Sequence, residues 1–389
     1  MAADSSQAVR SVPVCVVAWR AGTGRCRRLS ARSADPETWN MTTLRFPLLA
    51  LASLTLAPVS FAGTPAQFTF LEQNGHLACD NTGTCRMVAF GPPAALKLGV
   101  LIERAAGPDT PVTARLSLAD GSDGAPRSPR VHPEGRLRLH VDGADLGDIG
   151  PVDALEAGLA LAPPHAQALL DALVRGRPVR MTDTAGQAWP LAENGNAALL
   201  LKMDEAQGRL HTPGALVGKG LRPESQVPAA RVAPRLVPPP LLVEAHDEDA
   251  ALAERADLLQ ALLPRAEAGA GCAAASSRHL RIERIDATHV LAMLNCTTGR
   301  YIRPAGSWVI RDRTPFAPVL ITASTLFPLY PHAVFFEEGF ASATDRCGID
   351  RHWAWDGARL VLAATFVGRH CLGAGQRHWQ LPTYVTELR

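Results

Sequence analysis

The sequence predicts an α+β fold that is mainly β, with two β-rich, sandwich-like domains and a few short helices, joined by a proline-rich linker. Short runs of alternating apolar and polar residues, each ended by Gly, Pro, Asp or Asn, recur along most of the chain, as is typical of antiparallel strands. Six prolines between residues 223 and 240 divide these runs into two groups. With 389 residues and 47% hydrophobic content, the chain is long enough to bury two cores.

The region from Met41 onward predicts a secretory signal peptide. Arg45 supplies a short positive segment, and residues 46–56 form an uncharged apolar stretch. Ser60 and Ala62 are small residues three and one positions before an expected cut. The apolar stretch is shorter than the about 20 residues that a transmembrane helix needs. We therefore expect a periplasmic protein with no stable membrane insertion after signal cleavage.

A buried core helix is the alternative interpretation of this segment. Pro47 and Pro58 disfavour it, because a proline inside a helix costs about 3 kcal/mol. We expect residues 1–40 to be a mis-assigned, disordered N-terminal extension and residues 41–62 to be the signal peptide, with translation starting at Met41.

The charge balance of the exported part argues against nucleic acid as a partner. The whole chain has 39 Lys and Arg against 37 Asp and Glu. Residues 1–62 contain seven basic and three acidic residues, which leaves 32 basic and 34 acidic residues in the rest of the chain. A slightly acidic mature chain lacks the basic surface that nucleic-acid binding requires.

An even number of cysteines in an exported chain predicts a disulfide framework. Two of the eight fall within residues 1–40, and the six that remain are Cys79, Cys85, Cys272, Cys296, Cys347 and Cys371. Six cysteines allow 15 connectivities. Because each local pair encloses a turn-rich loop or an apparent hairpin, we predict the bonds Cys79–Cys85, Cys272–Cys296 and Cys347–Cys371. A zinc site is the competing interpretation, but the sequence contains no Cys-x-x-Cys, so we expect neither a metal nor a cofactor.

The alternating runs place the strands. In the N-terminal half they cover residues 67–70, 85–90, 96–103, 112–118 and 137–141. In the C-terminal half, residues 281–283 pair with 290–292, and residues 353–355 pair with 360–362 around an Asp-Gly turn.

Three helices interrupt this pattern. Residues 165–174 and 197–206 each place their apolar side chains on one face. A third helix is predicted to begin near residue 247, where acidic residues suit a helix N-terminus, and to end at about residue 263. We divide the mature chain into an N-terminal β-rich domain (63–220), a linker (221–244) and a C-terminal β-rich domain (245–389).

Several spaced motifs resemble a known family. They are CDNTGTCR at 79–86, AALLLKMDEAQGR at 197–209, DRCG at 345–348, WAWDG at 353–357, and Trp379. Together they are similar to the exported bacterial proteins grouped as domain of unknown function 1176. The N-terminal half is also distantly similar to the invasion-associated locus B proteins. These resemblances imply a periplasmic location and a β-rich architecture, and no catalytic residue. Where the family is expected to have a Gly- and Lys-rich run before Cys347, this chain has Phe-Ala-Ser-Ala-Thr.

Motifs of common catalytic sites are absent from the sequence: it has no Gly-x-Ser-x-Gly, His-Glu-x-x-His or P-loop. Ser276, Ser277 and His279 are residue types that serve as nucleophile and base, but only their proximity in the sequence links them. Asp120, Ser122 and Asp123 offer oxygens to calcium, but a polar turn explains them equally.

Tryptophans give the one predicted ligand-binding surface. Trp353 and Trp355 lie two residues apart and so share one face of a strand, and with Trp379 they would form an aromatic platform for a glycan or peptide. The favoured interpretation is that these rings pack in the core over the Cys347–Cys371 bridge.

We therefore expect a non-enzymatic envelope protein that binds a partner protein or a cell-wall glycan, or a structural factor without a small ligand. The alternative is a cell-envelope hydrolase with its site between the two domains.

Overall fold

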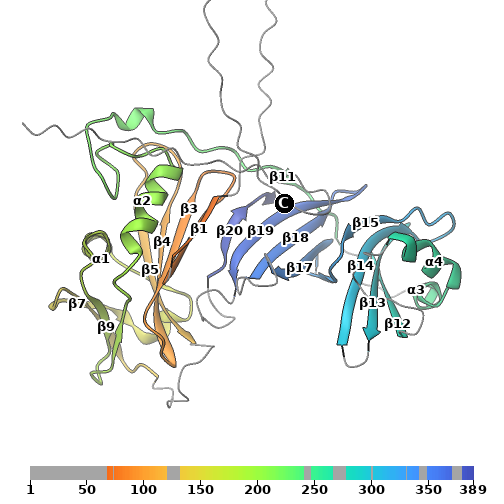
Figure 1. The fold of residues 1–389 in the computed structure, drawn as a ribbon, viewed down its shortest axis with the longest axis horizontal. Helices are drawn as coiled ribbons and strands as arrows, with labels where there is room; N and C mark the ends of the chain where they lie inside the picture. Colours follow the sequence, from red (N-terminus) through yellow and green to blue (C-terminus); the bar gives the residue numbers. More distant parts are fainter. Residues whose placement is uncertain are drawn as a thin grey trace, which may run out of the picture. The chain divides into compact units, whose positions relative to one another are not determined.

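The computed structural model of the chain describes residues 68–72, 74–120, 132–240, 247–265, 277–298, 301–329, 331–340, 348–369 and 379–389 (Figure 1). The predicted extension and signal peptide (1–62) lie outside these residues, as do Cys272, Cys347 and Cys371. The described part is β-rich with several sheets and few short helices, which confirms the predicted fold class.

Two antiparallel sheets form the N-terminal half. The first has six strands in the order β1-β2-β3-β4-β5-β8 and the second has four in the order β10-β9-β6-β7. Their bounds are β1 (Phe68–Glu72), β2 (Gly75–Cys79), β3 (Cys85–Phe90), β4 (Leu96–Arg104), β5 (Val112–Asp120), β6 (Arg136–Val141), β7 (Ala144–Pro151), β8 (Leu159–Ala160), β9 (Val179–Thr182) and β10 (Ala188–Pro190), with a 3-10 turn η1 (Val152–Leu155). All five strands predicted in this half are present.

Two helices belong to the same half, and both confirm the prediction. The first is α1 (Pro163–Arg175) and the second is α2 (Asn196–Ala206). Proline at the first position suits the start of α1, because its missing N–H has no intrahelical partner there. Gly176 ends the helix in the left-handed region, at φ 62°, and its N–H bonds the carbonyl of Ala172.

One hydrophobic core joins both N-terminal sheets and both helices. Its buried members come from β2 to β6, β9, α1 and α2, and include Leu77, Leu116, Leu139, Leu169 and Leu199. The other face of the six-stranded sheet buries Ala78, Val88 and Phe90 together with residues of the C-terminal strands β19 and β20. Both faces of this sheet are therefore covered.

The predicted linker follows an ordered path up to Pro240. It contains a 3-10 turn η2 (Glu224–Gln226) and a short strand β11 (Arg235–Leu236), which pairs in parallel with β21 (Glu387–Leu388) near the C-terminus. The Arg231 N–H donates to the carbonyl of Thr82 at 3.0 Å, so the segment is also tied to the N-terminal sheet.

The C-terminal half contains two further antiparallel sheets, in the orders β12-β13-β14-β15 and β16-β17-β18-β19-β20. Their bounds are β12 (Ser277–Arg284), β13 (His289–Thr298), β14 (Tyr301–Arg311), β15 (Val319–Thr322), β16 (Leu326–Pro328), β17 (Val334–Phe340), β18 (Gly348–Trp355), β19 (Leu360–Arg369) and β20 (Leu381–Tyr384). Both predicted hairpins, β12–β13 and β18–β19, are present.

The third predicted helix is divided in two. It forms α3 (Asp247–Ala253) and α4 (Ala256–Leu262), followed by the 3-10 turn η3 (Leu263–Arg265). The break lies at Arg255, whose backbone is extended at φ −70° and ψ 121°. Its guanidinium lies 4.9 Å from the ring centroid of Phe316 and pairs with Asp257, contacts that the one-dimensional pattern does not contain. Among the described helices, none has the length and apolar character needed to cross a membrane.

Candidate functional site

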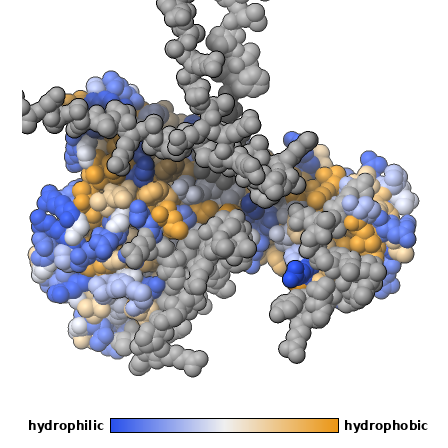
Figure 2. All heavy atoms as spheres, in the orientation of Figure 1, coloured by the Kyte–Doolittle hydropathy of each residue, from blue (hydrophilic) through white to orange (hydrophobic). Residues whose placement is uncertain are grey.

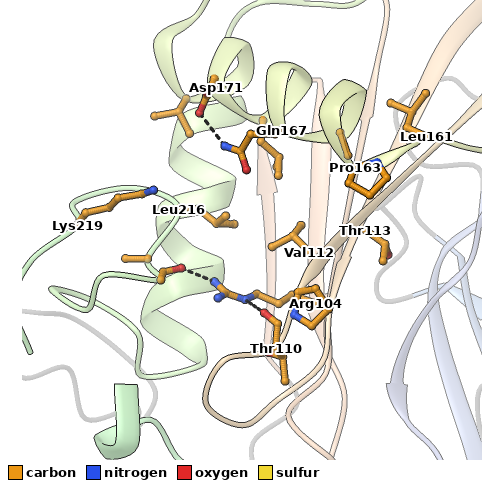
Figure 3. A pocket seen from close by; sticks show the side chains of 16 residues that line it. Arg104, Thr110, Val112, Thr113, Leu161, Pro163, Gln167, Asp171, Leu216 and Lys219 are labelled. Atoms are coloured by element: carbon orange, nitrogen blue, oxygen red, sulfur yellow. Dashed lines mark hydrogen bonds between the residues drawn. The ribbon is translucent and has the colours of Figure 1, made fainter. Parts of the chain in front are cut away.

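A cavity of about 490 Å³ opens between α1, the first residues of β5 and the loop 212–219; we call it the α1 pocket (Figure 3). Most of its wall is apolar, formed chiefly by Val112, Leu161, Ala166, Leu170, Val174 and Leu216. Pockets for small ligands and side-chain anchors commonly span about 300–1,000 Å³ and have this mixture of apolar walls and few polar groups. Figure 2 shows hydrophobic residues at the surface of the N-terminal half, bordered by hydrophilic ones.

The helical repeat explains how α1 supplies one wall. Ala166, Leu170 and Val174 are four residues apart and so form one stripe along the helix. Leu169 and Leu173 lie on the adjacent stripe and are buried in the core. A helix with a wide apolar face can thus pack with one edge and line a cavity with the other.

Polar groups stand at the margins of the α1 pocket. Gln167 donates to Asp171 at 3.1 Å on the helix side, and Lys219 reaches in from the opposite loop (Figure 3). Arg104 closes another end, where its Nη1 donates to the carbonyl of Gly214 at 2.8 Å. Among the described residues, no serine, cysteine, histidine or aromatic side chain lines the pocket. The α1 pocket is therefore suited to a ligand group that is held by burial of apolar surface and oriented by a few polar contacts.

The loop that forms the second wall is held by Asp204, at the C-terminal part of α2. Oδ2 of Asp204 accepts the N–H groups of Leu216 at 2.7 Å and Val217 at 2.8 Å. Asp204 is fully buried, and burial raises its pKa, while the two backbone hydrogen bonds act in the opposite direction. The Asp204 carboxylate thus accepts hydrogen bonds from loop N–H groups that would otherwise bond to water.

A second carboxylate fixes the start of the same loop. Oε1 of Glu224 accepts the N–H of Gly214 at 2.7 Å, and Oε2 lies 3.3 Å from Nη1 of the fully buried Arg209. Arg209 also donates to the carbonyl of Gly107 and to Thr110 Oγ1. The loop is therefore connected to both α2 and the β4–β5 turn.

The four charged groups balance one another. Arg104 and Arg209 contribute two positive charges, and Asp204 and Glu224 contribute two negative ones. Burial, together with the nearby Arg209 guanidinium, lowers the pKa of Arg104 to about 10, against the opposing effect of the two carboxylates. A buried ionic cluster of this kind depends on every partner being present, because removal of one leaves an uncompensated charge.

Gln207 links this cluster to the disulfide loop between β2 and β3. Its side-chain Nε2 donates to the carbonyls of Gly83 at 3.0 Å and Arg104 at 2.9 Å. The Cys79–Cys85 bond closes that loop, which confirms the predicted pairing. Inside the loop, Oδ1 of Asp80 accepts the N–H of Thr82 at 2.9 Å. The motifs at 79–86 and 197–209 therefore form one connected structure.

The remaining cysteine predictions are met in part. Cys296 is disulfide-bonded, and it is buried in the core beneath α3 and α4. Its pairing with Cys272 and the bond Cys347–Cys371 fall outside the described residues and stay predictions.

The three predicted tryptophans lie in different surroundings. Trp355 is 1% exposed and packs in a C-terminal core, and Trp353 is partly buried against the same core with its Nε1 donating to Glu337 at 3.1 Å. Trp379 lies beside β4 and β5, where it lines a small cavity of about 190 Å³ with Glu103 and Arg115. The three rings do not form one exposed surface, and a ligand-binding role for them stays a prediction.

Most other candidates from the sequence fall where the structure describes no side chain. Ser276, Ser122 and Asp123 lie outside the described residues, and nothing is described of the side chains of Ser277 and Asp120. Within the described ranges, no group of three or more His, Cys, Asp or Glu side chains is arranged to hold a metal ion.

Sequence reasoning missed the residues that line the α1 pocket. Arg104, Gln167, Asp171 and Lys219 belong to no motif, and they meet only through the packing of α1 against the loop 212–219. One signal was available, because the motif at 197–209 contains polar residues that a simple amphipathic helix does not need.

The fold and the site thus define a β-rich protein with a largely apolar cavity in its disulfide-bonded N-terminal half. The chain belongs to the family described as Protein of unknown function (DUF1176), whose sequence model matches residues 72–386. No curated protein and no solved structure matches the chain.

Proposed function

We propose that this protein is exported and acts in the cell envelope as a non-enzymatic binding protein, with the α1 pocket receiving an apolar side chain of a partner protein. The observation that carries the proposal is the pocket itself: about 490 Å³ with a mainly apolar wall and polar groups only at its margins. Buried apolar anchors in such pockets provide much of the binding energy of protein complexes.

Two features of the chain support export. Residues 41–62 have the layout of a signal peptide, and the Cys79–Cys85 bond is of a kind that persists in oxidising compartments such as the periplasm. N-terminal sequencing of the exported protein should begin at or near Gly63. A mature product that begins at Met1 or Ala2 would contradict export through this signal.

The lining favours a protein anchor over a cell-wall glycan. Sugar rings commonly stack on aromatic side chains, and no Phe, Tyr or Trp lines the α1 pocket. An aliphatic or aromatic side chain of a partner would instead exclude water from Leu170, Val112 and Leu216, and burial of apolar area contributes about 25 cal/mol per Å². Gln167, Asp171 and Lys219 are placed to bond the partner's backbone or polar neighbours.

The experiment uses the fluorescent apolar anion 1-anilinonaphthalene-8-sulfonate as a probe of the α1 pocket. We expect saturable binding with one site, displaced by short blocked peptides with a central Leu or Phe. Gln167→Trp places a bulky ring at the pocket wall and should weaken probe binding at least tenfold. Gln187→Trp is the matched control, because Gln187 is exposed in the β9–β10 turn and does not line the pocket.

Near-ultraviolet circular dichroism should show that both variants keep their tertiary packing, since compact states that have lost this packing also bind the probe and retain the far-ultraviolet signal. Equal probe affinity in the two variants, or displacement by N-acetylglucosamine oligosaccharides and not by peptides, would refute the proposal. The hydrolase that the sequence left as an alternative has no observation in its favour among the described residues. The cavity beside Trp379 contains one carboxylate, Glu103, and not the pair that glycosidic hydrolysis uses.

A further inference from the structure

A second cavity, of about 410 Å³, lies at one end of the sheet β12–β15, between the β12–β13 turn and the β14–β15 loop. We call it the β13 cavity. It is lined by Thr288, His289, Arg311, Asp312, Arg313, Thr314 and Pro315. The two loops are joined directly, because the N–H of Asp312 donates to the carbonyl of Thr288 at 3.1 Å. This wall is rich in hydrogen-bond donors, unlike that of the α1 pocket.

The imidazole of His289 is held in one orientation. Its Nδ1 lies 3.1 Å from both carboxylate oxygens of Asp286 and 3.0 Å from Thr288 Oγ1. The ring packs against Trp355, with 5.2 Å between the ring centroids. Asp286 is itself fixed by the backbone N–H groups of Thr288 and His289, each at 2.8 Å. With Nδ1 occupied, Nε2 is the nitrogen left for a ligand.

The acidic residue of the cavity wall pairs with arginines on two sides. Oδ2 of Asp312 lies 3.1 Å from Nη1 of Arg284, a buried guanidinium that also pairs with Asp249. The hydrogen bonds to Asp249 raise the pKa of Arg284, so this arginine keeps its charge although it is buried. Oδ1 of Asp312 lies 3.3 Å from Nε of Arg313, so Arg284 and Arg313 together balance Asp249 and Asp312, and the charge of Arg311 is left in excess among these five groups.

The two arginines of the wall remain available for a ligand. The Arg311 guanidinium makes no hydrogen bond or ion pair with the described part of the chain. Arg313 is 80% exposed and touches only Asp312, at 3.3 Å, among the described residues. The Thr288 hydroxyl is already used, since it donates to Oδ1 of Asp286 at 3.2 Å. The accessible surface therefore presents two guanidiniums, one histidine nitrogen and the hydroxyl of Thr314.

We propose that the β13 cavity binds a phosphate group of a small molecule. Arg311 and Arg313 supply forked N–H donors that match phosphate oxygens, the Thr314 hydroxyl supplies a further donor, and His289 Nε2 offers a further polar contact. A carboxylate has only two oxygens and one charge, whereas a phosphate ester has three free oxygens and up to two charges, which fits this donor set better. The site is independent of the α1 pocket and of the function proposed for it.

The test is calorimetric titration of the folded protein with inorganic phosphate, with methyl phosphate and with acetate. We expect saturable binding of both phosphates, and affinity for acetate at least tenfold weaker. Arg311→Gln should weaken phosphate binding at least tenfold. Arg180→Gln is the matched control, because Arg180 is exposed on β9 in the N-terminal half and does not line the cavity, and the change should leave the affinity unchanged.

His289→Gln provides a second variant that retains both arginines and should also weaken phosphate binding. Gln167→Trp, which fills the α1 pocket, should not change phosphate affinity, so failure of one site is distinguishable from failure of the other. Lack of saturable phosphate binding, equal affinity for acetate, or an equal loss in Arg180→Gln would overturn the proposal.

Discussion

The carboxylate of Asp204 accepts the backbone N–H of Leu216 at 2.7 Å, and this contact couples a helix of the core to the wall of a pocket. Asp204 lies at the C-terminal part of α2, and Leu216 lines the α1 pocket from the loop side. A loop held by a buried charge keeps one conformation, because its N–H groups have no water to bond in place of the carboxylate. The shape of the pocket should therefore depend on residues that do not line it.

Asp204→Ala tests this dependence. The change leaves Arg104 and Arg209 with less compensation in a buried cluster and removes the partner of two loop N–H groups. We expect the free energy of unfolding in urea to fall by about 3–5 kcal/mol. The neighbouring Glu205→Ala should stay within about 0.5 kcal/mol of the parent, because Glu205 is exposed and pairs only with Lys202 among the described residues. Similar losses in the two variants would contradict a special role for Asp204.

The buried His76 should make the protein sensitive to acid. Burial lowers the pKa of this histidine from 6.5 to about 4, because the charged ring is poorly solvated on β2. Between these values the unfolded chain binds the proton that the folded chain does not, so stability is lost as the pH falls. We expect a contribution of about 2 kcal/mol to be lost between pH 7.5 and pH 5.

The comparison that isolates this effect is the urea unfolding of His76→Gln against His132→Gln at both pH values. In His76→Gln the free energy of unfolding should not show this loss between pH 7.5 and pH 5, whatever its value at pH 7.5. His132 is exposed, and its replacement should leave the loss in place. An identical pH dependence in both variants would show that His76 is not the responsible group.

Asn81, in the disulfide loop, should anchor the C-terminal segment. Its Oδ1 accepts the N–H of Val385 at 2.7 Å, and its Nδ2 donates to the carbonyl of the same residue at 3.0 Å. In Asn81→Ala the amide of Val385 should exchange with deuterium at least tenfold faster, a change of about 1.4 kcal/mol in local opening. Asn194→Ala, at an exposed position before α2, should leave that rate unaltered. Unchanged protection of Val385 in Asn81→Ala would mean that β20 alone holds the segment.

Peptide mapping without reduction should recover three short-range disulfides. The structure shows Cys79–Cys85 and a disulfide-bonded Cys296, and the hairpins β12–β13 and β18–β19 place their strands as the local pairings require. We therefore expect Cys272–Cys296 and Cys347–Cys371 in the mature protein. A cross pairing such as Cys272–Cys347 would refute this assignment.

The local elements were predictable because each depends on residues close together in the chain. The apolar stripe of α1, the proline at its start and the glycine at its end are all readable within residues 163–176. The turn inside the Cys79–Cys85 loop is equally local. The division of the third helix at Arg255 was not predictable, because it accompanies a contact between residues distant in sequence. The Arg255 guanidinium lies over the ring of Phe316.

The sequence by itself determined the β-rich class, the helices α1 and α2, the hairpins, and the Cys79–Cys85 bond, since backbone propensity, side-chain period and turn residues act over a few positions. Only the tertiary structure decided which distant groups meet: Arg104 with Gly214 across 110 residues, and Gln207 with Gly83 across 124. Those contacts follow from strand order and from the packing of α1 and α2 on the sheet, where buried polar groups must find partners wherever the chain brings them. The α1 pocket is a product of that packing, and no single segment of the sequence contains it.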